Sequence, residues 1–129
     1  MGRICYIKIT LSRCHARTRF RDREMTIKKM IYITQLIYIV KGQEQVFDQF
    51  ESVAIPLISI YNGQLLIRSR PTQVTIIEQH IEMPYEIHLV QFNTETDFEN
   101  FMKDDERKKF LHLKEQSIKS VLLVKGIKL

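Results

Sequence analysis

The chain has 129 residues, of which 44% are apolar and 27% charged, which is the size and composition of one soluble globular domain. With only 4 glycines and 3 prolines, it is not a collagen-like or low-complexity chain. Its net charge of +5 lies in residues 1–24, which hold seven of the 20 basic and two of the 15 acidic side chains and leave 13 of each in residues 25–129.

The first 24 residues differ from the rest of the chain in charge and cysteine content. We interpret them as a disordered extension, or as sequence upstream of a true start at Met25. A basic arm that binds nucleic acid and an organelle transit peptide are the alternatives. Cys5, Cys14 and His15 lack the paired spacing of a zinc site. No cysteine follows residue 25, which fits a cytoplasmic protein.

The first part of the domain predicts a strand followed by a helix. Met30–Val40 is rich in isoleucine and tyrosine and too short for a typical helix, which indicates a strand. After a turn at residues 41–43, apolar residues recur in steps of three and four over Glu44–Tyr61, which indicates an amphipathic helix. We expect Pro56 to kink it and Gly63 to end it in the left-handed conformation. The predicted apolar stripe consists of Val46, Phe50, Val53, Leu57 and Tyr61, with Phe47, Ala54 and Ile58 beside it.

Extended segments dominate the middle of the domain. Gln64–Ser69 is predicted to be a second strand, which Pro71 interrupts. Thr72–Gln79 is expected to resume extended structure as a bent or edge continuation. After a turn at residues 82–84, Tyr85–Phe92 is the third predicted strand.

Helical patterns and one more strand complete the domain. Thr94 and Asp97 have the spacing of a capping box at the start of a helix. Asp104 is placed to cap a second helix over Glu106–Gln116. Ser120–Ile127 is the last predicted strand.

The resulting order of strand, helix, strand, strand, helix, strand is typical of the ferredoxin-like βαββαβ fold, an α+β architecture with one antiparallel sheet and helices on one face. The first strand carries Tyr32, Leu36 and Tyr38 on one face and Ile31 and Ile33 on the other, without the polar alternation of a solvated sheet face. A second subunit on the open face explains this pattern, so we expect a symmetric homodimer.

Three motifs resemble one protein family. Val53–Arg68 (VAIPLISIYNGQLLIR) is similar to the pattern V-x-P-L-x-x-x-Y-x-G-x-x-L-x-R of the bacterial 1330 family of domains of unknown function. Pro84–Phe92 and Glu106–Gly126 are similar to later segments of that family, so the resemblance covers about residues 28–128. Where the family has Asn-Ser-Pro-Glu-Tyr, this chain has Lys103–Arg107, and an arginine replaces the tyrosine. The resemblance implies the dimeric α/β-barrel superfamily, and it implies no particular reaction.

Two residues are candidates for chemistry. His88 alternates with Glu86 and Val90, so it becomes a candidate general base if that face lines a cleft between sheet and helices. A hydrogen-bonded histidine at a sheet face is the structural alternative. Arg68 can hold a carboxylate or phosphate, or it can form an ion pair with Glu78 or Glu86 on a neighbouring strand.

Other side chains give weaker signals. Tyr32 and Tyr38 can offer phenolic groups to a pocket or pack in an interface. The acidic run Asp104–Glu106 fits a helix N-terminus better than a cation site, and Arg107–Lys109 fits the solvated face of that helix. We therefore expect no cofactor and no metal, no nucleic-acid partner except through residues 1–24, and no membrane partner.

The functional prediction is a homodimer that binds a small organic molecule in a pocket between sheet and helices. A cofactor-free enzyme of the monooxygenase, isomerase or decarboxylase type, using His88 and Arg68, is one alternative. A non-catalytic dimeric interaction module is the other.

Overall fold

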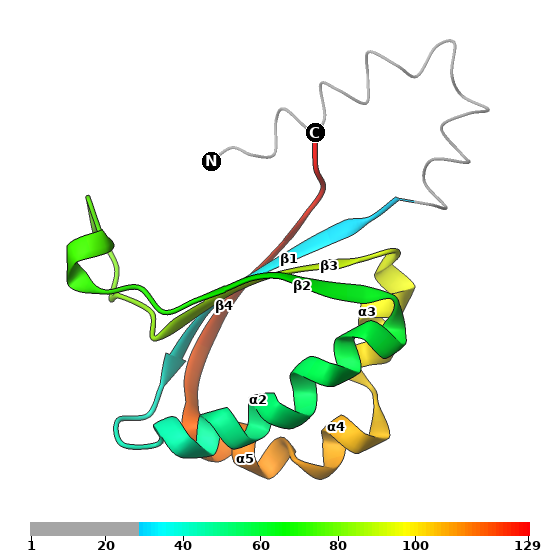
Figure 1. Cartoon of the computed structure of the whole chain (residues 1–129), viewed down its shortest axis with the longest axis horizontal. Coiled ribbons are helices and arrows are strands. Elements are labelled where there is room, and N and C mark those ends of the chain that lie inside the picture. Colours follow the sequence, from blue (N-terminus) through cyan, green and yellow to red (C-terminus); the bar gives the residue numbers. More distant parts are fainter. Residues whose placement is uncertain (1–28) are drawn as a thin grey trace.

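The computed structural model describes residues 29–129, so the expectations for residues 1–24 and for the alternative start at Met25 lie outside the described residues. The described chain forms a four-stranded antiparallel sheet with its helices on one face (Figure 1). In chain order the elements are β1 (Ile31–Ile39), α2 (Glu44–Ile58), the 3-10 turn η1 (Ser59–Tyr61), β2 (Gly63–Ser69), the 3-10 turn η2 (Gln73–Thr75), β3 (Glu86–Phe92), α3 (Glu95–Met102), α4 (Asp105–Lys109), α5 (Leu111–Ser117) and β4 (Ile118–Gly126).

The sheet has the strand order β2-β3-β1-β4. The central strand β1 pairs with β3 on one side and with β4 on the other, and β2 pairs with β3 at the edge. Helices follow β1 and β3, and both crossovers lie on the same face of the sheet (Figure 1). This arrangement confirms the predicted α+β ferredoxin-like fold.

Strand β1 shows how its sequence specifies two different faces. Ile33 and Ile37 are each only 1% exposed and point toward the helices, whereas Tyr32 and Leu36 lie on the opposite face and are half-buried. Because side chains alternate along a strand, every second residue enters the core. The core between β1, β3 and the helices consists of Ile31, Ile33, Ile58, Val90, Phe92 and Phe101.

Helix α2 covers the sheet with a stripe that differs slightly from the prediction. Its buried side chains are Phe47, Phe50, Glu51, Ala54 and Ile58, so the stripe is centred beside the predicted one and includes a carboxylate. Pro56 lies inside the helix, near its end.

The end of α2 corrects the expectation for Gly63. Asn62 takes the left-handed conformation, with φ of 60°, and Gly63 begins β2 instead. A glycine is required there because a Cβ would lie 2.6 Å from Cε1 of Phe92 and 2.7 Å from Cγ2 of Ile58. The glycine therefore serves close packing of strand and helix.

Two further segments differ from the sequence prediction. Thr72–Gln79 does not continue β2: the chain leaves the sheet, forms the short turn η2, and returns only at β3. The predicted helix over Glu106–Gln116 is two helices, α4 and α5, which meet at Phe110. Strand β4 begins at Ile118, directly after α5.

The predicted helix starts at Thr94 and Asp104 are confirmed. The Thr94 hydroxyl accepts a hydrogen bond from the backbone N–H of Asp97 at 3.0 Å, and the Asp104 carboxylate accepts one from the N–H of Arg107 at 2.8 Å. Each side chain satisfies a backbone donor that the first helical turn leaves free.

Strand β2 contains a bulge. Leu65 pairs with Val90 and Ile67 pairs with Leu89, so Leu66 is an extra residue between two regular stretches. Arg68 then pairs with His88, which brings both onto the face that the helices cover.

Over residues 29–129 no helix is both long and apolar enough to cross a membrane.

Candidate functional site

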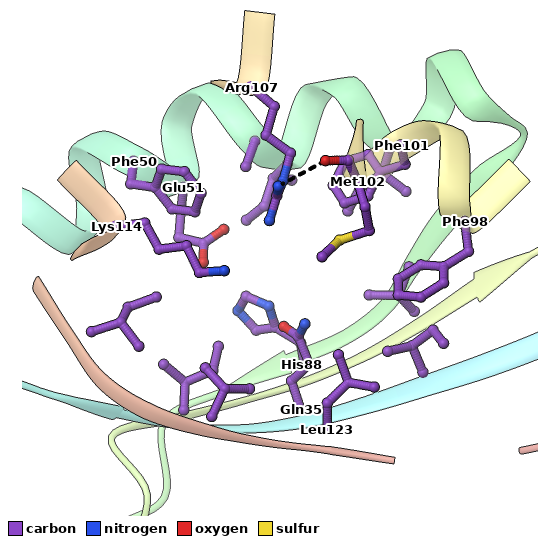
Figure 2. A pocket seen from close by; sticks show the side chains of 18 of the residues that line it. Gln35, Phe50, Glu51, His88, Phe98, Phe101, Met102, Arg107, Lys114 and Leu123 are labelled. Carbon is purple, nitrogen blue, oxygen red and sulfur yellow. Dashed lines mark hydrogen bonds between the residues drawn. The ribbon is translucent and has the colours of Figure 1, made fainter. Parts of the chain in front are cut away.

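A cavity of about 240 Å³ lies between the sheet and the helices. Its wall is mostly apolar, with five polar side chains that project into it from both sides (Figure 2). The polar lining residues are Gln35, Glu51, His88, Arg107 and Lys114. The apolar ones are Ile33, Ile37, Phe50, Ala54, Ile55, Ile58, Val90, Phe92, Phe98, Phe101, Met102, Ile118, Val121 and Leu123.

On the sheet side, His88 is held by a buried carboxylate. His88 is 3% exposed and Glu86 is fully buried. The two residues alternate along β3 on the same face, and Nε2 of His88 lies 2.5 Å from Oε2 of Glu86. His88 therefore lies on the face of the sheet that lines the cavity between sheet and helices.

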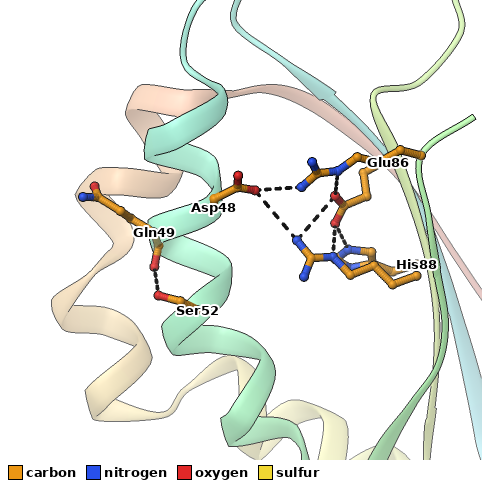
Figure 3. Close-up of polar contacts among 7 residues, drawn as sticks. Asp48, Gln49, Ser52, Glu86 and His88 are labelled. Atoms are coloured by element: carbon orange, nitrogen blue, oxygen red, sulfur yellow. Dashed lines mark hydrogen bonds and ion pairs between the residues drawn. The ribbon is translucent and has the colours of Figure 1, made fainter.

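Two arginines, one at the end of β2 and one just after it, also bind the carboxylate of Glu86. Nε of Arg68 donates to Oε2 at 2.6 Å, and Nε of Arg70 donates to Oε1 at 2.7 Å. Nη2 of Arg70 also donates to Asp48 of α2 at 2.8 Å. Figure 3 shows this chain of contacts between Asp48, Glu86 and His88. Arg68 thus forms the ion pair with Glu86 that the sequence offered as an alternative, and it does not line the cavity.

The charge state of Glu86 determines the proton position on His88. Burial raises the pKa of Glu86, but hydrogen bonds from His88, Arg68 and Arg70 outweigh burial and lower it to about 2. An ionised carboxylate only accepts hydrogen bonds, so Nε2 of His88 must donate. In a neutral imidazole the lone pair is then on Nδ1, for which the described residues supply no hydrogen bond.

On the helix side, three charged groups face the histidine. Glu51 comes from α2, Arg107 from α4 and Lys114 from α5, and Figure 2 shows all three side chains directed into the cavity. Arg107 is only 7% exposed, and its Nη1 donates to the carbonyl oxygen of Met102 at 3.3 Å.

Burial changes the ionisation of these groups. Burial is the main reason that the pKa of Glu51 is raised and that the pKa of Lys114 is lowered, and neighbouring Arg107 lowers the latter further. Both changes favour the uncharged form of the group more than solvent would. Arginine stays protonated, so Arg107 is the fixed charge of the cavity.

The tyrosines that the sequence suggested do not line this cavity. Tyr32 and Tyr38 belong to the face of β1 that points away from the helices, and the hydroxyl of Tyr38 donates to the carbonyl oxygen of Glu82 at 2.7 Å. His80 and His112 are exposed.

Sequence reasoning missed four of the five polar lining residues, namely Gln35, Glu51, Arg107 and Lys114. Arg107 is buried, so the expectation that Arg107–Lys109 forms a solvated helix face is wrong for Arg107. The signal available was its spacing, because Arg107, Leu111 and Lys114 are separated by four and three residues. Glu51 is likewise four residues after Phe47 and three before Ala54, inside the apolar stripe.

Comparisons with known proteins identify the fold. No family model matches the chain, and no curated protein matches it. The resemblance to the 1330 family therefore has no support from a family match.

Solved structures do match most of the chain. A protein of unknown function from Rhodopseudomonas palustris has a TM-score of 0.68 at 10% identity, covering 88% of this chain and 94% of that chain. A dimeric protein of unknown function from Bacteroides fragilis, with a ferredoxin-like fold, has a TM-score of 0.54 at 14% identity, covering 77% and 96%.

A third match is a putative antibiotic biosynthesis monooxygenase from Bacteroides thetaiotaomicron, with a TM-score of 0.58 at 11% identity, covering 81% of this chain and 92% of that chain. At these identities the likeness concerns the fold and not the activity. The chain is therefore an α+β protein with the ferredoxin-like fold.

Proposed function

We propose that the protein binds a small organic molecule in the cavity between the sheet and the helices. The observation that carries this proposal is the cavity itself, where an apolar wall surrounds a few converging polar side chains, among them His88 and Arg107. Such a combination is typical of small-molecule sites. The volume of about 240 Å³ equals that of about eight water molecules at roughly 30 Å³ each, so the ligand is about the size of benzoate.

The binding proposal is tested by NMR on the full chain. A panel of neutral, anionic and cationic compounds of about eight to ten non-hydrogen atoms is titrated, and the methyl signals of Ile33, Val90 and Leu123 are followed. Ala54→Met, which places a larger side chain in the cavity, should remove the shifts, whereas Ser52→Met on the exposed side of α2 should keep them. If no compound moves these signals, or if Ala54→Met leaves the shifts intact, the proposal is wrong.

A second candidate function is proton transfer with His88 as general base. It is favoured by the hydrogen bond to Glu86, which orients the ring and leaves the Nδ1 lone pair for a ligand. In this function Arg68 is a positioning residue, since it holds Glu86 and does not reach the cavity. Proton exchange of bound carbon acids in D₂O, followed by NMR, should fall about a hundredfold or more in His88→Gln. Equal exchange in wild type and variant would exclude this role.

We also propose that the protein is a homodimer through the open face of the sheet. Ile67, Leu122 and Val124 are each about half exposed, at 51–54%. The strand registers place Leu36 beside Leu122 and Ile87, and Leu89 beside Ile67, so the apolar side chains form one continuous area. A second copy that covers this area agrees with the dimeric Bacteroides fragilis protein of the same fold and with the resemblance to the 1330 family.

A further inference from the structure

The guanidinium of Arg107 is buried with an unused donor. The residue is 7% exposed, and among the described residues its Nε is the buried side-chain nitrogen without a hydrogen-bond partner. Its remaining contacts are weak for a charged group. Nη1 donates to one backbone carbonyl at 3.3 Å, and the guanidinium carbon lies 5.3 Å from the ring centroid of Phe101 and 5.8 Å from that of Phe50. In the described chain no carboxylate oxygen lies within 4 Å of the guanidinium nitrogens of Arg107, and the carboxylate of Asp104 binds its backbone N–H instead.

A buried cation without a counter-charge is costly, so such groups are normally paired. The missing partner is not supplied by the sheet. Glu86 is the buried carboxylate on that side, and Arg68 and Arg70 already neutralise it. Glu51 lies on the same wall as Arg107, and its burial favours the protonated, uncharged form.

The charges of the cavity wall therefore have an excess of one sign. Arg107 and Lys114 point into the cavity as two basic groups, and Glu51 is the single carboxyl that faces them from the helices. Gln35 and His88 face them from the sheet and carry no fixed charge. A bound group with one negative charge balances this wall, and a cationic group adds to the repulsion.

We infer that the ligand of this cavity is a small carboxylate, whose carboxyl group binds the guanidinium of Arg107 and whose apolar body fills the space next to His88. This inference rests on the proposed binding function. A carboxylate matches the fork of guanidinium donors, because two oxygens accept two parallel N–H bonds. Lys114 adds a second donor to the same group.

A carboxylate ligand also fits the arrangement of polar and apolar side chains across the cavity. With the anionic group on the helix side, the rest of the ligand extends toward the sheet, where the ring of His88 lines the cavity. The apolar side chains of Ile33, Val90 and Met102 lie between these two ends and suit an aliphatic or aromatic body.

The test compares probes of the same shape and different charge. Benzoate, benzamide and benzylamine are titrated into the full-length wild-type protein by calorimetry at one pH and one salt concentration. Charge-assisted hydrogen bonds are worth about ten- to hundredfold in affinity, so benzoate should bind at least about tenfold more tightly than benzamide, and benzylamine should bind weakest. Equal affinity for benzoate and benzamide, or preference for benzylamine, overturns the carboxylate inference.

Variants assign the preference to Arg107. Arg107→Met should reduce the affinity for benzoate to that for benzamide, while benzamide binding stays within about threefold. Lys109→Met is the matched control, because it removes one positive charge from the same helix at an exposed position paired with Glu106, and it should leave both affinities unchanged. If Arg107→Met does not fold, the wild-type preference for benzoate and the loss of that preference in Lys114→Met decide the matter.

The outcomes distinguish the carboxylate inference from the proposed binding function on which it rests. If benzamide and benzoate shift the cavity methyl signals equally, the cavity is a binding site and the carboxylate inference fails. If no probe of any charge shifts these signals, the binding function itself fails. If benzoate is preferred and Arg107→Met retains that preference, the carboxylate lies elsewhere and the assignment to Arg107 is wrong.

Discussion

Glu86 and His88 lie two residues apart on β3, and Oε2 of Glu86 lies 2.5 Å from Nε2 of His88 on the face of the sheet that the helices cover. The alternation of the strand makes this contact possible, since both side chains project to the same side. The arginines behind Glu86 keep it ionised, so one buried carboxylate connects a surface ion-pair cluster to a histidine in the cavity.

The stability of the protein should depend on the ionisation of Glu86. Its pKa falls from the ordinary 4.5 to about 2 in the folded state, so this group contributes stability that is complete above pH 4.5 and is lost as the pH falls toward 2. The free energy of unfolding, measured with urea at fixed protein concentration, should show a difference between wild type and Glu86→Gln that shrinks by up to about 3 kcal/mol between pH 6 and pH 2. Glu99→Gln, at an exposed position of α3, is the control for loss of one carboxyl. A difference that does not vary with pH contradicts this prediction.

Gly63 should be intolerant of even one methyl group. A Cβ at this position meets Phe92 and Ile58 at distances that require the core to move, so Gly63→Ala should cost about 1–3 kcal/mol of unfolding free energy. Gly126→Ala is the matched control, because a Cβ there meets nothing within 4 Å, and it should stay within about 0.5 kcal/mol of wild type. Urea unfolding measures both, and equal effects of the two substitutions would show that the contact at Gly63 is not tight.

The N-terminus of α3 should depend on Thr94. Its hydroxyl accepts from the N–H of Asp97, so Thr94→Ala should lower the free energy of unfolding by about 1 kcal/mol. Thr96→Ala makes the same chemical change at an exposed position inside the first turn, where no capping bond exists, and should be neutral or slightly stabilising. Thr94→Ser should restore most of the loss, because serine also caps helices. If serine and alanine behave alike, the capping bond does not contribute.

The proposed dimer should dissociate when a charge enters the open face. Leu122 on β4 is 51% exposed in the single chain, and Leu122→Lys places an ammonium group in the middle of the proposed interface. Sedimentation or light scattering at micromolar concentration should show twice the chain mass for wild type and the single chain mass for the variant. Ile60→Lys, at a 66% exposed position in η1, is the control and should remain dimeric. A wild-type monomer at this concentration would remove the dimer proposal.

Periodicity was sufficient to predict the order of strands and helices, because alternation and three- to four-residue steps report which side of an element is buried. Alternation also put His88 on the same face as Glu86 and Val90, and these three side chains are buried together on β3. Periodicity did not predict the segment between β2 and β3, where extended structure was expected over Thr72–Gln79. Val74 and Ile77 are 91% and 101% exposed. Their apolar, β-branched side chains led to the prediction of a strand, but this segment does not join the sheet.

The helix side of the cavity was harder to predict than the sheet side. A charged residue in a helix is normally solvated, and the sequence does not show that Arg107 is enclosed by Phe50 and Phe101. The break at Phe110 adds to the difficulty, because it separates α4 from α5 and ends the continuous helical spacing. Tertiary packing, and not local propensity, determines which of these cations faces inward.

The extra residue Leu66 divides β2 into two segments with opposite phase. Before it, odd-numbered positions such as Leu65 face the helices, and after it even-numbered Arg68 does so. A perfectly regular strand that kept Leu65 in the core would send Arg68 to the opposite face, and Glu86 would lose one of its two guanidinium partners. The first half of the strand thus packs in the core and the second half holds Glu86, and one residue inserted or deleted between them would exchange the faces that their side chains take.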